Sequence, residues 1–178
     1  MSATTDSSGA TRPESGHTGC LFCGKKNLYS LELGFQPESE NGVRAHFRPH
    51  TGFQGYAGIM HGGAVAGVLD AAMTHCLFHA EVKAMTADLH VRYAKPVPCG
   101  MEYDVRAWIL SSDPPLYCLR AEISDDREVL AWAEGKFLKE GHPDNSHSDP
   151  AGLDPSRAHE GKPGVTGSPP TEDNHADA

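Results

Sequence analysis

The sequence has no long hydrophobic run. Across its 178 residues, no stretch approaches the roughly 20 consecutive apolar residues that a membrane-spanning helix needs. The first 19 residues also lack the apolar core of roughly 7 to 15 residues that a secretory signal requires. We therefore expect a cytoplasmic protein with no membrane partner.

Positive charge is scarce as well. The chain has 15 Lys and Arg against 24 Asp and Glu, a formal net charge of −9, and residues 141–178 alone contribute −5 of it. No segment concentrates Lys and Arg into the basic face that nucleic-acid-binding domains present. This composition argues against a nucleic-acid partner.

The chain has few cysteines, and their number is odd. Five cysteines without a secretory signal predict reduced thiols and no disulfide framework. Cys20 and Cys23 have the spacing of metal ligands or a redox pair, and His17 precedes them by three residues. A zinc site needs about four ligands, and the fold would have to bring in distant residues such as His75 and His79. We therefore expect no metal.

The two ends of the chain lack large apolar side chains. Residues 1–17 are rich in Ser, Thr and Gly, and residues 141–178 carry six prolines, seven acids and four of the eleven histidines. Such segments cannot bury enough surface to offset the entropy of ordering them. We predict disordered tails over residues 1–17 and 141–178 and one folded domain over residues 18–140. The tail histidines could bind a metal loosely, although a solvated tail explains them better.

The folded domain alternates apolar and polar residues in short runs. Such alternation predicts half-buried strands, and the pair Asn41-Gly42 predicts the turn between the first two. Residues 62–80 are instead apolar or small around almost the whole helical circumference, which predicts a helix wrapped by sheet. The expected class is α+β, with one long helix and an antiparallel sheet of about six strands. The expected strands cover residues 29–36, 43–48, 85–94, 102–110, 116–123 and 129–138.

Asp70 stands inside this apolar helix. A carboxylate there must shift its pKa or find hydrogen bonds. Gly63, Gly67, Asp70 and Thr74 share one helical stripe, and each glycine inside the helix costs about 0.5–1 kcal/mol relative to Ala. That cost is understandable if something approaches the backbone closely. On composition alone, an Asp that caps a loop or pairs with an arginine remains an alternative.

The same stripe reaches the helix start at His61, Gly62 and Gly63. Helix N-termini present free N–H groups with partial positive charge, and these can hold a carbonyl oxygen as it becomes negative. Together with the Asp70 carboxylate two turns along, they form a minimal set of groups for attack on an activated acyl carbon. The Thr74 hydroxyl could orient the attacking water or the carboxylate.

Two motifs in this region resemble a known family. Residues 55–63, GYAGIMHGG, followed by Asp70 nine positions after His61, resemble the signature of hotdog-fold thioesterases of the phenylacetate-pathway (PaaI-like) type. Residues 86–100, TADLHVRYAKPVPCG, are similar to that family's T-x-x-L-x-V-x-Y-x-x-P-V-x-x-G pattern. Members also begin with a similar Cys-x-x-Cys-Gly run, which favours a packed loop for Cys20 and Cys23. The resemblance covers roughly residues 20–139.

The resemblance implies a hotdog fold and an acyl-CoA thioesterase without a cofactor. Asp70 would be the general base or nucleophile, and the backbone of Gly62, alone or with Gly63, would supply the oxyanion donor. His61 would shape the loop or contact the thioester, and Thr74 matches a helical hydroxyl of some relatives. Hotdog sheets pair into homodimers, often then homotetramers, with active sites at the subunit boundary.

The substrate is less well defined by the sequence. The phosphates of coenzyme A would seek cations such as Arg92 or Lys95, and the acyl tunnel would be lined by side chains such as Tyr56, Met60 and Met73. Two other functions stay open. One is a hotdog hydratase or dehydratase that pairs His61 with Asp70, and the other is a non-catalytic acyl-CoA-binding protein.

Overall fold

The computed structural model describes residues 17–39, 41–139 and 141. The predicted tails, residues 1–17 and 141–178, lie outside these residues except at their inner ends. Along the chain the elements are β1 (Gln36–Ser39), β2 (Gly42–Phe47), a short 3₁₀ helix η2 (Thr51–Phe53), α1 (Gly62–His79), β3 (Ala84–Tyr93), β4 (Tyr103–Asp113), β5 (Leu116–Ser124) and β6 (Val129–Lys139). In the described part of the chain, no helix is long and apolar enough to cross a membrane.

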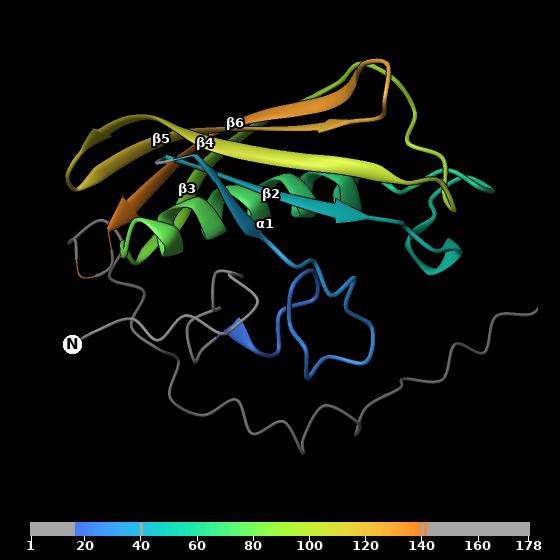
Figure 1. Ribbon diagram of the computed structural model, residues 1–178, viewed down its shortest axis with the longest axis horizontal. Helices are drawn as coiled ribbons and strands as arrows, with labels where there is room; N and C mark the ends of the chain where they lie inside the picture. The colour runs from blue at the N-terminus through green and yellow to red at the C-terminus, as the bar shows by residue number, and fades with distance from the viewer. Residues whose placement is uncertain (1–16, 40, 140, 142–178) are drawn as a thin grey trace, which may run out of the picture. The chain divides into compact units, whose positions relative to one another are not determined.

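The six strands form one antiparallel sheet in the order β1-β2-β4-β5-β6-β3. The helix α1 lies against one face of this sheet, and the loop of residues 17–33, which we call the Cys loop, lies on the other side of the helix (Figure 1). This is the arrangement expected of a hotdog fold. The predicted α+β class, with one long helix and an antiparallel sheet, is confirmed.

The core forms where the helix meets the sheet. Val68, Leu69 and Met73 of α1 are fully buried against the inward-facing positions of the strands. The inward positions of β4, β5 and β6 are occupied by Val105, Ala107, Leu119, Ala121, Ile123, Ala131, Ala133 and Phe137. The small residues in this set let the helix lie close to the sheet. Gly135 of β6 does the same, since a Cβ there would stand 3.2 Å from the Met73 sulfur.

The predicted strand over residues 29–36 is wrong in extent. The strand β1 begins only at Gln36, because Leu31 and Leu33 donate their backbone N–H groups to Leu21 and Phe22 of the Cys loop and not to a neighbouring strand. Glu32 adopts a positive φ of 51°, which breaks an extended strand. The apolar alternation was a signal of burial, since Leu33 is buried, and not of sheet pairing.

The strand β3 is an edge of the sheet and is unusually open. It pairs with β6 on one side only, and seven of its ten side chains are exposed while the other three are half-buried. A ten-residue edge presents a row of N–H and C=O groups that can pair with another strand.

Candidate active site

The start of α1 is fixed by the loop before it. His61 donates its backbone N–H to the Phe53 carbonyl over 2.8 Å, and its ring caps the helix by accepting the Gly63 N–H at Nδ1 over 2.9 Å. A helix-start residue has no intrahelical acceptor, and no hydrogen bond within residues 17–39 and 41–139 takes the Gly62 N–H. Gly62 therefore carries the available donor, whereas the Gly63 N–H is occupied by His61.

Asp70 lies half-buried two turns further along the helix. The hydroxyl of Thr86 on β3 donates a hydrogen bond to the Asp70 carboxylate, with 2.7 Å between Oγ1 and Oδ1. Burial raises the pKa of Asp70 above its ordinary value, and the Thr86 hydrogen bond partly opposes that shift. A raised pKa makes the carboxylate a stronger base near neutral pH.

Thr86 was missed as a partner because of a β-bulge. The register of β3 on β6 shifts between Thr86 and Asp88, so Thr86 lies opposite the inward-facing Phe137. Strict alternation would have put Thr86 on the same face as Asp88. The sequence held one hint of the bulge. Thr86 stands three residues before Leu89, so the two side chains can share a face only if the alternation of the strand is interrupted between them. Thr74, the expected hydroxyl, is half-buried on α1.

Tyr93 at the other end of β3 holds the helix start. Its hydroxyl donates to the Gly62 carbonyl over 3.0 Å. Tyr93 lies opposite Ala131 of β6, whose side chain is buried against the helix. The same strand therefore contacts α1 at both candidate positions, Gly62 and Asp70.

A groove of about 310 Å³ opens beside the helix start. It is lined by the Cys loop, by η2 and the residue that follows it, and by the first turn of α1 with its cap. The lining residues are Leu21, Phe22, Gly52, Phe53, Gln54, His61, Gly63 and Ala64. Phe22 also explains Gly67, because a Cβ at Gly67 would stand 2.2 Å from the Phe22 ring. The close approach that the glycine stripe predicted is thus made in part by the protein's own side chain.

The other predicted substrate-binding residues lie apart from this groove. Tyr56 is 86% exposed, whereas Met60 and Met73 are buried in the core. Arg92 lies opposite Trp132 on the strand face that points away from the helix. Lys95 forms an ion pair with Glu128, so its charge is already matched.

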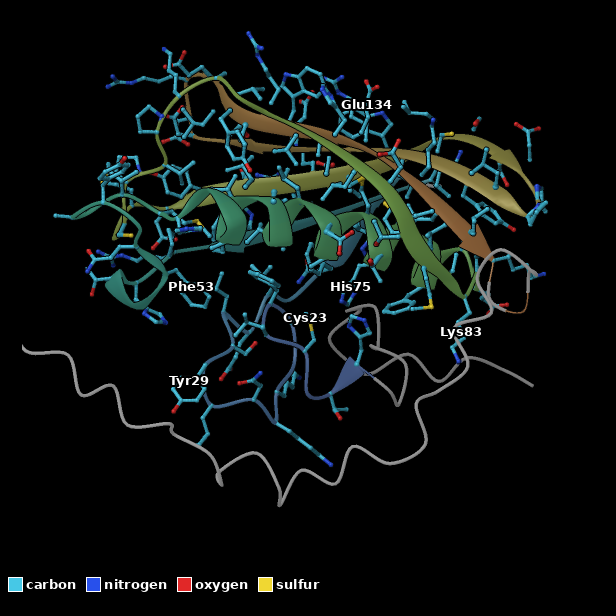
Figure 2. All side chains as sticks on the ribbon, turned by 180° about the vertical axis from the view of Figure 1, so that it is seen from behind. Cys23, Tyr29, Phe53, His75, Lys83 and Glu134 are labelled. Carbon is cyan, nitrogen blue, oxygen red and sulfur yellow. The ribbon has the colours of Figure 1, made fainter. Side chains whose placement is uncertain are left out.

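The Cys loop is brought against α1, which the sequence could not reveal. Cys23 and His75 lie close together between the loop and the helix (Figure 2). A hydrogen bond from Cys23 lowers the pKa of the Cys20 thiol to about 5, and burial lowers the pKa of His75 to about 4. The expected packed loop is present.

Helix geometry separates the two chemical groups within one chain. Gly62 and Asp70 are eight residues apart, and a rise of 1.5 Å per residue puts them about 12 Å apart along the axis. An oxyanion donor must lie about 3 Å from the developing oxyanion. One carbonyl group therefore cannot reach both groups of the same chain.

Comparison with known proteins agrees with this architecture. Residues 57–131 match the model of the thioesterase superfamily. A segment of 64 residues is 36% identical to the acyl-coenzyme A thioesterase THEM4 of Rattus norvegicus. This segment covers 36% of this chain and 27% of that protein. The chain thus spans about a quarter of the length of this curated relative.

Solved structures extend the likeness to the fold. One thioesterase superfamily protein matches with a TM-score of 0.63 and 25% identity, over 66% of this chain and 61% of that chain. The E. coli PaaI protein of the phenylacetic acid degradation operon matches with a TM-score of 0.58 and 14% identity, over 61% of this chain and 84% of that chain. A hypothetical thioesterase of Streptococcus pneumoniae, solved with coenzyme A, matches with a TM-score of 0.57 and 11% identity. The match covers 60% of this chain and 84% of that chain. Residues 57–131 of the chain thus match the thioesterase superfamily in sequence, and the fold of the chain is similar to that of solved proteins that include E. coli PaaI.

Proposed function

We propose that the protein hydrolyses acyl-CoA thioesters to a free acid and coenzyme A. The observation that carries this proposal is a half-buried carboxylate, Asp70, on the same helix as the Gly62 N–H, a donor that no group in the described part of the chain accepts. Base and oxyanion donor are the two groups that acyl transfer to water requires. The matched family and the THEM4 relative favour the same reaction.

The site is assembled from two copies of the chain. Because about 12 Å of helix separates Gly62 from Asp70, a complete site needs the Asp70 of one copy and the Gly62 of another. The open edge of β3 offers the pairing surface. If two β3 edges pair antiparallel, the two helices run in opposite directions, and the start of one can face the middle of the other. We therefore infer a homodimer, which can pair again into a tetramer.

In this arrangement the thioester carbonyl points its oxygen at the Gly62 N–H. The Asp70 carboxylate takes a proton from water as the water oxygen attacks the carbonyl carbon, and the oxyanion is held by Gly62. When the intermediate collapses, the C–S bond breaks and the coenzyme A thiolate takes the proton back from Asp70. Direct attack by Asp70 to form an anhydride is the other route open to the same carboxylate. Single-turnover hydrolysis in ¹⁸O-water tests the second route, because ¹⁸O enters Asp70 only if an anhydride forms and water attacks its Asp70 carbonyl carbon.

The deciding experiment follows thiol release from short, medium, long and aromatic acyl-CoAs. Asp70→Asn should lower kcat by about a hundredfold or more, the scale of a lost general base. Asp88→Asn is the matched control, because Asp88 lies on β3 close to Thr86 but is exposed. No thiol release from any substrate would overturn the proposal. Hydration of an enoyl-CoA would then indicate a hydratase, and binding without turnover an acyl-CoA-binding protein.

A further inference from the structure

A cluster of nitrogen and sulfur ligands lies between the Cys loop and α1. Ligand atoms of His17, Cys23 and His75 all lie within 4.8 Å of one another, and Nδ1 of His17 is 3.3 Å from Sγ of Cys23. The first two residues belong to the loop and the third to the helix. Among the described residues no carboxylate belongs to this cluster, so its donor set of imidazole and thiol is the one that suits zinc.

Cys20 adds a second sulfur beside the first. The thiols of Cys20 and Cys23 interact directly, and the Phe22 N–H points at Cys20 Sγ over 3.4 Å. The turn closes with the Gly24 N–H bonded to the Cys20 carbonyl over 3.0 Å. Only glycine fits at position 24, where a Cβ would stand 2.4 Å from the Cys20 backbone nitrogen. The backbone is thus folded to hold two sulfurs on one side, with an N–H directed at one of them.

We propose that His17, Cys20, Cys23 and His75 bind one Zn²⁺ ion in a tetrahedral site. Zinc bonds of about 2.3 Å to sulfur and 2.0–2.1 Å to nitrogen place neighbouring ligand atoms roughly 3.3–3.8 Å apart. The 3.3 Å between Nδ1 of His17 and Sγ of Cys23 already meets this spacing, and the other pairs among His17, Cys23 and His75 lie within 4.8 Å and need to close by up to about 1.5 Å. Cys20 lies outside this group of three and would reach the ion by turning its side chain, which already contacts the Cys23 thiol. On binding, the two thiols release two protons to solvent and the imidazoles coordinate through neutral nitrogens, so no redox partner is needed.

The surroundings make this a structural site and not a second catalytic one. His75 is 1% exposed and Cys23 is 4% exposed. The His75 ring stacks on Phe35 with centroids 4.4 Å apart, and Phe78 lies edge-on at 5.3 Å. His17 and Cys20 are half-buried. Four protein ligands would fill the tetrahedral shell and leave no position for substrate, which is typical of structural zinc.

The consequence of zinc binding falls on the groove. The ion would join the Cys loop to α1 through His75, and Phe22, between the two cysteines, packs on Gly67 and lines the groove beside the helix start. Zinc would therefore hold one wall of that groove in place. The metal site stands on its own geometry and does not depend on the reaction proposed above.

The test uses the full chain without an affinity tag. After zinc loading and gel filtration, metal analysis should find one zinc per chain, and Cys20→Ser/Cys23→Ser should lose it. Cys99→Ser and His79→Gln are the matched controls, since neither residue belongs to the cluster. Cobalt substituted for zinc should give the intense visible bands of tetrahedral coordination and a thiolate charge-transfer band. His17→Ala, which changes only a half-buried loop residue, should weaken both signals if the double variant does not fold.

Three results would overturn the proposal. The first is a folded wild type that holds no zinc after loading. The second is unchanged zinc in Cys20→Ser/Cys23→Ser, which would assign the ion to histidines elsewhere, including those of residues 142–175. The third is a Cys20–Cys23 disulfide in protein purified without air, found by intact mass before and after reduction. Such a disulfide would identify the two cysteines as a redox-active pair.

Discussion

Thr86 on β3 donates a hydrogen bond to Asp70 on α1, with 2.7 Å between the two oxygens. The bond joins the edge strand of the sheet to the carboxylate on which the proposed chemistry depends. It also opposes the rise that burial imposes on the pKa of Asp70.

Replacing Thr86 by Val should therefore move the acidic limb of the rate profile to higher pH. The carboxylate loses a hydrogen bond that favours its ionised form, so its pKa rises further, and activity at mildly acidic pH should fall severalfold. The groups that act on Asp70 from the neighbouring Cys loop, Cys20 and His17, are unchanged in this variant. Thr74→Val is the matched control, and kcat/KM against pH is the measurement. A limb that moves only in Thr74→Val would assign the orienting role to the helix hydroxyl.

Replacing Gly62 by Pro should remove the oxyanion donor with little change to the fold. Gly62 is the first helical residue, where proline is favoured, and the preceding His61 has the extended conformation that proline requires (φ −63°, ψ 137°). We expect kcat to fall by about 10²–10³. Gly62→Ala keeps the N–H and its Cβ meets Tyr93 at an ordinary 3.6 Å, so it should keep most activity. Equal loss in both variants would indicate a steric effect instead.

Mixing two inactive variants should restore activity if the site is shared. In a dimer of one Asp70→Asn chain and one Gly62→Pro chain, one of the two sites has both groups intact. Random exchange of subunits would then recover up to about a quarter of wild-type turnover. If each chain used its own Asp70 and Gly62, no mixed dimer would contain a complete site, and turnover would stay at the level of the separate variants.

Gly67 and Phe22 should be energetically coupled. A Cβ at Gly67 would overlap the Phe22 ring, so Gly67→Ala must displace it, although Ala favours a helix by up to about 1 kcal/mol. In a Phe22→Ala background the overlap is gone and Gly67→Ala should stabilise. Urea unfolding of the four proteins should give a coupling free energy of about 0.5–3 kcal/mol. Additive free energies would show that the Phe22 ring moves aside without an energetic penalty.

Asp70→Asn should be more stable than wild type at neutral pH. Burial raises the pKa of Asp70 in the folded state, so ionisation above the unfolded-state value destabilises the fold. The gain, about 0.5–2 kcal/mol on the scale of single stabilising substitutions, should shrink as the pH falls from the raised pKa of folded Asp70 towards the ordinary aspartate pKa, and it should vanish below that value, where both states are protonated. Denaturant unfolding at neutral and acidic pH measures it. A gain that is independent of pH would have another origin.

The sequence predicted the helix and five of the six strands closely, because their apolar periodicity is clear. It also pointed to Asp70 and the helix start as a candidate site, since a carboxylate in an apolar stripe stands out, and the catalytic role of these residues stays a prediction. It failed where tertiary contacts decide. The bulge that turns Thr86 inward, the Phe22 ring on Gly67 and the meeting of His17 with His75 depend on segments far apart in the chain. The run of residues 29–35 misled because burial against a loop gives the same alternation as a strand.

The single strand β3 contacts α1 near both groups of the proposed chemistry, through Thr86 at Asp70 and Tyr93 at Gly62. A slip of one residue along β6 would turn both side chains to the opposite face of the sheet at once. Folding errors at this edge would thus be all-or-none for catalysis: a chain with β3 in the wrong register loses both supports together, and no half-assembled site would accumulate.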